Sequence, residues 1–183
     1  MSDTFFGIQV AVWAPPMDPW RTKLTQLVRR HQADMAIRDK RTLYGSLGNL
    51  LRERADRCAL GFWDFVADGR AEFDDWCKGI EDDTAEVWVP DATGAAMDHV
   101  LVSAMFLMPT GGPAADLTGE RCDRPESTWM QRNTFRHLFE TMAMLNFASV
   151  RSDAIYVTPG GDRLGFSLRE LQEEGYDYLE RVE

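Results

Sequence analysis

The sequence has few of the side chains that bind transition metals or form covalent cross-links. It contains three cysteines and three histidines, all well separated along the chain: Cys58, Cys77, Cys122, His31, His99 and His137. No two cysteines form a CxxC pair, and their odd number argues against a disulfide framework or a tetrahedral zinc site. We therefore predict no metal and no cofactor, and we expect Cys58 and Cys77 to be small core residues on helices.

Long apolar runs are also missing. The longest nearly unbroken run, Val100 to Pro109, has about half of the ~20 residues that a transmembrane helix needs, so it predicts a buried strand. The first residues, MSDTFFGIQV, have no basic segment ahead of an apolar stretch, which predicts that no secretory signal is present. The sequence thus predicts a soluble protein in the cytoplasm, with no membrane insertion.

Motifs of nucleophilic catalysis and of phosphate binding are absent as well. The sequence has no GxSxG, GxxxxGK[ST] or GxGxxG, and no cysteine stands in a recognised cysteine–histidine context. The glycines Gly160 and Gly161 look at first like part of a phosphate loop. However, Ser167 to Glu170 fits the capping box S-x-x-E, which predicts a corner between a strand and a helix. These absences argue against most enzyme classes.

The net charge of −10 is unevenly distributed. Residues 21–57 contain ten basic and four acidic residues, whereas the remainder contains ten basic and 26 acidic ones. The acidic majority repels nucleic acid and anionic membranes, so neither is expected as a partner. The basic segment is either a docking face on an acidic body or the solvated side of two helices. Its candidate contact residues are Arg29, Arg30 and Arg41.

Hydrophobic periodicity predicts one α+β domain over residues 1–183. Its single mixed sheet is expected to have about four to five strands covered by amphipathic helices, in the order β-α-α-β-α-(β)-β-α-β-α. The expected strands are 5–14, 61–69, 98–109 and 153–159, with a short edge strand at 85–90. The expected helices are 19–28, 42–59, 70–83, 135–145 and 167–183.

Three local patterns are informative within this plan. Alternate residues from Phe6 to Val12 are apolar and share one face, which predicts a half-buried strand. In the second helix, Gly45 and Gly48 stand three apart, which either lets another helix approach closely or is merely tolerated. Residues 109–131 are rich in glycine, proline and charge and have no periodicity. They are predicted to form a long polar loop, a kind of segment that is usually functional or mobile.

The C-terminal stretch carries a resemblance to a known family. The residues concerned are Thr158-Pro159, Gly161-Asp162 with Leu164, Ser167, Glu170-Leu171 and Tyr176. This pattern resembles the C-terminal end of an uncharacterised domain family of cyanobacteria and plastids, which includes a plant protein of fluctuating-light acclimation. Three other stretches, IQVAVWA, LLRE and DHVLVSAMFLM, are similar to further parts of that family.

The resemblance implies a mixed α and β fold and a soluble bacterial relative of the family. The family has no assigned activity or catalytic residues, so the resemblance implies none for this chain. This chain differs from the plastid members because it lacks a transmembrane or transit segment. That difference argues against carrying over a photosynthetic or membrane role.

The aromatic residues suggest an interaction surface. Trp129 and Met130 stand beside Arg132 and Arg136, and these residue types are enriched in binding patches. A hydrophobic staple ahead of the next helix explains Trp129 equally well. We predict a non-enzymatic regulatory or scaffolding protein that acts through another protein or through a second copy of itself.

An alternative hypothesis is a small-ligand-binding or enzymatic domain. Its pocket would lie between the central strand and the 109–131 loop. The candidate groups for that pocket are His99, Cys122 and His137.

Overall fold

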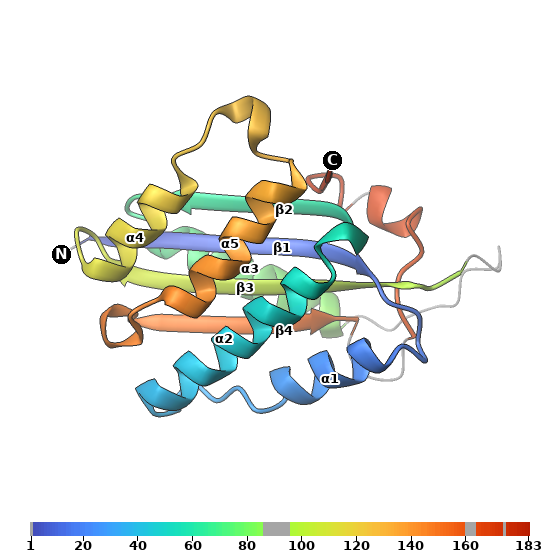
Figure 1. Ribbon diagram of the computed structural model, residues 1–183, viewed down its shortest axis with the longest axis horizontal. Helices are drawn as coiled ribbons and strands as arrows, with labels where there is room; N and C mark the ends of the chain where they lie inside the picture. The colour runs from blue at the N-terminus through green and yellow to red at the C-terminus, as the bar shows by residue number, and fades with distance from the viewer. Residues whose placement is uncertain (1, 86–95, 160–163, 174) are drawn as a thin grey trace.

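The computed structural model describes residues 2–85, 96–159, 164–173 and 175–183. It has one five-stranded sheet with the strand order β4-β3-β1-β2-β5, flanked by helices (Figure 1). The strands are β1 Asp3–Trp13, β2 Cys58–Val66, β3 His99–Pro109, β4 Ser152–Thr158 and β5 Glu180–Arg181. The predicted α+β class is confirmed, and every described strand pair is antiparallel rather than mixed in direction.

Four helices cover the front face of the sheet as drawn in Figure 1, and they bury the side chains of Phe6, Ile8 and Val10. They are α1 Pro19–Val28, α2 Ile37–Glu53, α4 Pro113–Cys122 and α5 Arg132–Met144. The first of them starts as predicted, because the Asp18 side chain accepts a hydrogen bond from the Trp20 N–H at 2.9 Å and Pro19 follows the cap. None of the helices in the described part of the chain is long and apolar enough to span a bilayer.

The back face of the sheet is covered in two separate parts. Helix α3, Arg70–Ala85, packs on Phe5, Met105 and Leu107 at one end of the strands. The C-terminal segment, residues 164–179, contributes Phe166, Leu171 and Leu179 to a second cluster at the other end. The stretch of sheet between the two covers is the region where a site can form.

The prediction that the first strand is half-buried is wrong. Residues Asp3 to Val12 of β1 are all buried, because β1 lies between β2 and β3 and has cover on both faces. Alternation in the sequence shows only that one face is apolar. Phe5 and Ala11 on the back face are as fully buried as Phe6 on the front.

Residues 109–131 do not form the predicted loop, because they contain helix α4 and a 3₁₀ turn at Glu126–Thr128. The buried face of α4 is made of Ala114, Ala115, Thr118 and Cys122. Such small side chains give a weak hydrophobic signal, although they suit a helix that approaches its neighbours closely. Pro113 occupies the first turn of the helix, where its missing N–H has no cost.

The predicted last helix is also wrong. Residues 167–183 contain only a 3₁₀ turn at Glu170–Gln172 and the two-residue strand β5 among the described positions. Gly175 has φ +102°, a conformation that ends a helix. The predicted edge strand 85–90 lies outside the described residues except for Ala85. The pair Gly160-Gly161 lies outside them entirely.

The predicted capping box is nevertheless present. The Ser167 N–H donates to Glu170 Oε2 at 2.6 Å, and the Glu170 N–H donates to Ser167 Oγ at 3.2 Å. These reciprocal bonds satisfy backbone amides at the start of the 3₁₀ turn. The motif therefore organises the C-terminal segment without starting a long helix.

We expect Ser167→Ala to lower the free energy of unfolding by about 1 kcal/mol, because it removes the Oγ atom that accepts the hydrogen bond of the Glu170 N–H. Urea denaturation followed by circular dichroism measures the change. Ser46→Ala is the control, since Ser46 Oγ only donates to the Thr42 carbonyl within α2. Equal midpoints for Ser167→Ala and the wild type would show that the box does not stabilise the fold.

Candidate functional site

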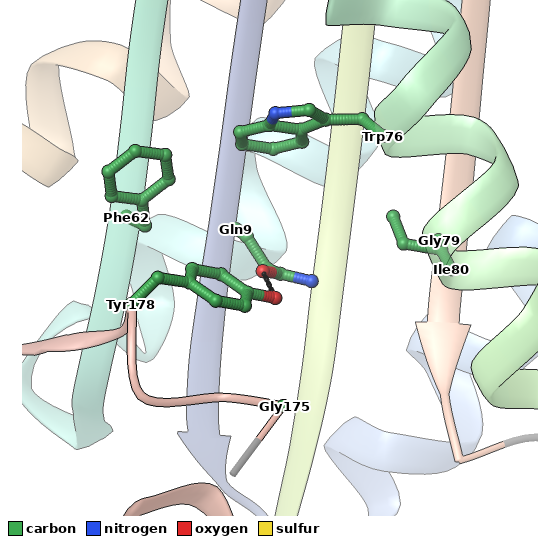
Figure 2. A pocket seen from close by; sticks show the side chains of 7 residues that line it. All are labelled: Gln9, Phe62, Trp76, Gly79, Ile80, Gly175 and Tyr178. Atoms are coloured by element: carbon green, nitrogen blue, oxygen red, sulfur yellow. Dashed lines mark hydrogen bonds between the residues drawn. The ribbon is translucent and has the colours of Figure 1, made fainter.

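A pocket of about 310 Å³ lies on the back face of the sheet, between α3 and the C-terminal segment (Figure 2). Its lining residues are Gln9, Phe62, Trp76, Gly79, Ile80, Gly175 and Tyr178. The strand register determines which side chains form the floor of the pocket. Gln9 of β1 pairs with Phe62 of β2 and with Ser103 of β3. Ser103 in turn pairs with Tyr156 of β4, so one row of side chains crosses the sheet at this level.

The floor carries a buried polar chain. Gln9 is 2% exposed and Ser103 is 0% exposed. Gln9 Nε2 donates to Ser103 Oγ at 2.9 Å, and the Tyr178 hydroxyl donates to Gln9 Oε1 at 2.6 Å. A glutamine amide has two N–H donors and two acceptor positions, so one donor and one acceptor of Gln9 remain.

The walls of the pocket are aromatic. The Phe62 ring lies 5.8 Å from the Trp76 ring at 31°, and 5.8 Å from the Tyr178 ring at 80°. Trp76 Nε1 donates to Glu72 Oε1 at 2.9 Å, which fixes the indole in one orientation. Figure 2 shows the Gln9 amide next to the Tyr178 hydroxyl, with the Trp76 ring above it, Phe62 on the side of β2 and Ile80 on the side of α3.

Carboxylates stand near the pocket, but none of the described residues that line it is charged. Glu72 is bonded to Trp76, and Glu81 accepts a hydrogen bond from the Tyr156 hydroxyl at 2.9 Å. Burial, with a further contribution from the bond to Glu81, raises the pKa of Tyr156, so this phenol stays neutral. The surroundings of the pocket therefore disfavour an anion and provide neutral hydrogen-bonding groups.

A second polar cluster lies on the front face at the edge strand β4. Asp153, whose side chain is 1% exposed, accepts from the Tyr44 hydroxyl at 3.0 Å and lies 2.8 Å from His31 Nε2. Lys40 Nζ contacts the other carboxylate oxygen. Burial alone would raise the pKa of Asp153, but the hydrogen bonds from His31, Lys40 and Tyr44 outweigh it and hold the pKa below its ordinary value.

This Asp153 cluster has the arrangement of a structural anchor. Both carboxylate oxygens are engaged by groups from α2 and from the segment that follows α1. The cluster therefore fixes the connection between α1 and α2 against β4. Tyr44 is fully buried, and the side chains of His31 and Lys40 are only 16% and 15% exposed, so the cluster gives a substrate little access.

The structure does not bring the three predicted pocket residues together. His99 starts β3 on the back face, where its backbone pairs with Phe166. Cys122 is buried at the end of α4 on the front face, and burial raises the pKa of its thiol to about 12. His137 lies on α5, also in front, with Nδ1 3.7 Å from Glu140 Oε2. The sheet separates His99 from the other two, so they do not line a common pocket.

The seven predicted interface residues fall into two groups. The first group lies beside the chain end, where the Arg132 N–H donates to the Glu183 carbonyl at 2.7 Å. It contains Trp129, Met130, Arg132 and Arg136; Trp129 is 43% exposed and packs edge-to-face on Trp63. The second group, Arg29, Arg30 and Arg41, is exposed around α1 and α2 at the β4 side. The two groups therefore do not belong to a single docking face. Binding to a protein partner stays a prediction.

Sequence reasoning missed the residues of the back-face pocket. Gln9 gave the one usable signal, because it is polar and stands amid the apolar residues of an expected strand. Trp76 was expected on the apolar face of its helix, and it does pack on Phe5 there. Tyr178 had no signal, since its segment was expected to be helical.

Comparisons of the chain with protein-family models, with curated proteins and with solved structures found no match. The resemblance to the cyanobacterial and plastid family therefore stays a prediction. A fold alone does not specify a function, so the geometry and chemistry of the site are the features that indicate one.

Proposed function

We propose that this chain is a small-molecule-binding domain whose site is the back-face pocket. The observation that carries the proposal is the buried chain Ser103–Gln9–Tyr178 at the base of an aromatic-walled pocket. Ligand pockets in proteins typically combine apolar and aromatic walls with a few fixed polar groups, in volumes of roughly 300–1,000 Å³. The pocket matches this description in both composition and size.

The position of Gln9 strengthens the proposal. An amide buried in the middle of a sheet costs free energy unless it is hydrogen-bonded, and an apolar residue would fill the position without that cost. The fold keeps the amide and orients it with two partners from β3 and from the chain's last residues. A group held in this way is suited to recognising a ligand.

Binding is better supported than catalysis. The residues that line the pocket include no histidine, cysteine, carboxylate or lysine among the described part of the chain. The one hydroxyl among the described lining residues, that of Tyr178, donates its proton to Gln9 and is therefore not placed as a nucleophile or general base. The proposal thus keeps the ligand-binding alternative from the sequence and moves its site to the back of the sheet.

The test uses a substitution that fills the pocket. Gly79 lines the pocket, and a Cβ at this position meets nothing within 4 Å, so a larger side chain can be added without a clash at its base. Gly79→Phe is expected to block binding, whereas Gly79→Ala at the same helical position should leave it intact. Both variants remove a glycine from α3, so neither should lose helix stability.

We expect a thermal-shift screen of small molecules to yield compounds that stabilise the wild type and Gly79→Ala but not Gly79→Phe. A compound present at 100 times its Kd adds about 2.7 kcal/mol to the free energy of unfolding, which is readily measured as a higher Tm. Compounds that stabilise all three proteins equally would place the site elsewhere. A broad library without any hit on the wild type would refute the proposed function.

A further inference from the structure

We infer that the back-face pocket selects a flat, uncharged ring compound bearing an amide-like edge, an N–H donor beside a C=O acceptor. Primary carboxamides on aromatic rings and cyclic lactams belong to this class. The inference rests on the proposed function and specifies its ligand.

The amide-like edge follows from the hydrogen-bonding capacity of Gln9. With Nε2 bonded to Ser103 and Oε1 bonded to Tyr178, Gln9 keeps one N–H and one lone pair. The nitrogen and oxygen of a glutamine amide can be assigned the other way round. In that case Ser103 would bond to Oε1 and Tyr178 to Nε2, and Gln9 would still keep one N–H and one lone pair. A ligand with an adjacent donor and acceptor complements both, as glutamine does when it binds a base edge with two hydrogen bonds.

The flat shape follows from the walls. Phe62, Trp76 and Tyr178 present three aromatic rings to one space, and the bond to Glu72 fixes the Trp76 ring. Aromatic side chains pack best against other rings in offset or edge-to-face arrangements. A planar ring can contact them while its polar edge reaches the Gln9 amide, which Figure 2 shows beside the Tyr178 hydroxyl and below the Trp76 ring.

The expectation that the ligand is uncharged follows from the side chains around the floor of the pocket. None of the described lining residues is basic, so a bound carboxylate would lose its hydration without gaining a cationic partner. It would also approach Glu72, which bonds the Trp76 indole. A cation would find no carboxylate among the described lining residues, and the nearby Glu72 and Glu81 already accept hydrogen bonds from Trp76 and Tyr156. An uncharged ligand avoids both costs.

Calorimetric titration with three matched probes tests this inference. Nicotinamide carries the ring and the carboxamide, nicotinate replaces the amide by a carboxylate, and 3-methylpyridine keeps the ring alone. We expect nicotinamide to bind the wild type with a Kd at least about tenfold below that of either analogue, because an unpaired or charged group at Gln9 costs affinity. Chemical shifts of the Trp76 indole N–H, assigned with Trp76→Phe, locate the binding.

Two variants separate recognition from folding. The double variant Gln9→Leu with Ser103→Ala removes both partners of the buried hydrogen bond, so neither is left unsatisfied, and it should abolish the preference for nicotinamide. Thr141→Val is the control, because it removes a buried side-chain hydrogen bond from α5 on the front face, away from the pocket, and it should retain the preference. Thermal melts confirm that both variants fold.

The outcomes distinguish this inference from the proposed function. Equal affinities for the three probes, no binding of nicotinamide, or a preference that survives in the double variant would overturn the inference. If other compounds bind the wild type and are blocked by Gly79→Phe, the pocket is still a ligand site and only the assigned ligand class is wrong. If no compound in the screen binds, both the inference and the proposed function are wrong.

Discussion

Gly48→Ala is expected to lower the free energy of unfolding by about 3 kcal/mol, whereas Gly45→Ala on the same helix leaves it unchanged or raises it by up to about 1 kcal/mol. The difference comes from the crossing of α2 and α5, which lie against each other on the front face (Figure 1). A Cβ on Gly48 would overlap the backbone carbonyl oxygen of Phe139. A backbone atom in a packed helix cannot move aside as a flexible side chain does, so the two helices would have to separate.

Gly45 is the matched control, because a Cβ there meets nothing within 4 Å. Both substitutions gain the same helix propensity, so the difference between them isolates the close approach of the helices. Urea denaturation followed by circular dichroism gives both free energies. If the two alanine variants were equally stable, α2 and α5 would not be packed as closely as the structure places them.

This glycine pair illustrates which features of the fold the sequence could predict. The spacing of Gly45 and Gly48 suggested a close helix approach, and the structure shows it at Gly48 only. Periodicity says which residues share a helix face, but the partner helix and the exact crossing point depend on the packing of distant segments. The strand that contains Val100 was predicted correctly, since its apolar residues on both faces are typical of a central strand.

The site was less predictable than the fold for the same physical reason. Gln9 and Tyr178 are 169 residues apart in sequence and meet only because the C-terminal segment lies on the back of the sheet. Gln9 and Phe62 are neighbours through strand register, which alternation within each strand does not fix. Local patterns can therefore nominate a polar residue in a strand, but they cannot supply its partners.

The Asp153 cluster provides the second large effect. We expect Asp153→Asn to lower the free energy of unfolding at pH 7 by about 3 kcal/mol, because removing one member of a buried ion pair leaves the other without its counter-charge. Lys40 loses that counter-charge, and His31 Nε2 and the Tyr44 hydroxyl each lose a charged hydrogen-bonding partner. The connection between α1 and α2 should then detach from β4 more easily.

The pH dependence identifies the carboxylate as the cause. The pKa of Asp153 is lowered in the folded protein, so its stabilising contribution is complete above the unfolded value of about 4 and is lost as the pH falls through the lower folded pKa. Below about pH 4 the unfolded chain binds the proton more readily than the folded one does, and stability declines. The amide that replaces the carboxylate in Asp153→Asn cannot be ionised, so the stability difference from wild type should shrink in that range.

The control is Asp34→Asn, which removes an exposed carboxylate from the same α1–α2 connection. A surface change of this kind is expected to stay within about 0.5 kcal/mol of the wild type. Urea denaturation of the three proteins between pH 7 and pH 3 measures both effects. A loss at pH 7 that stays constant down to pH 3 would mean that the Asp153 side chain acts through its shape and hydrogen bonds rather than its charge. Equal stability of Asp153→Asn and Asp34→Asn at pH 7 would mean that the cluster does not anchor α1 and α2 to the sheet.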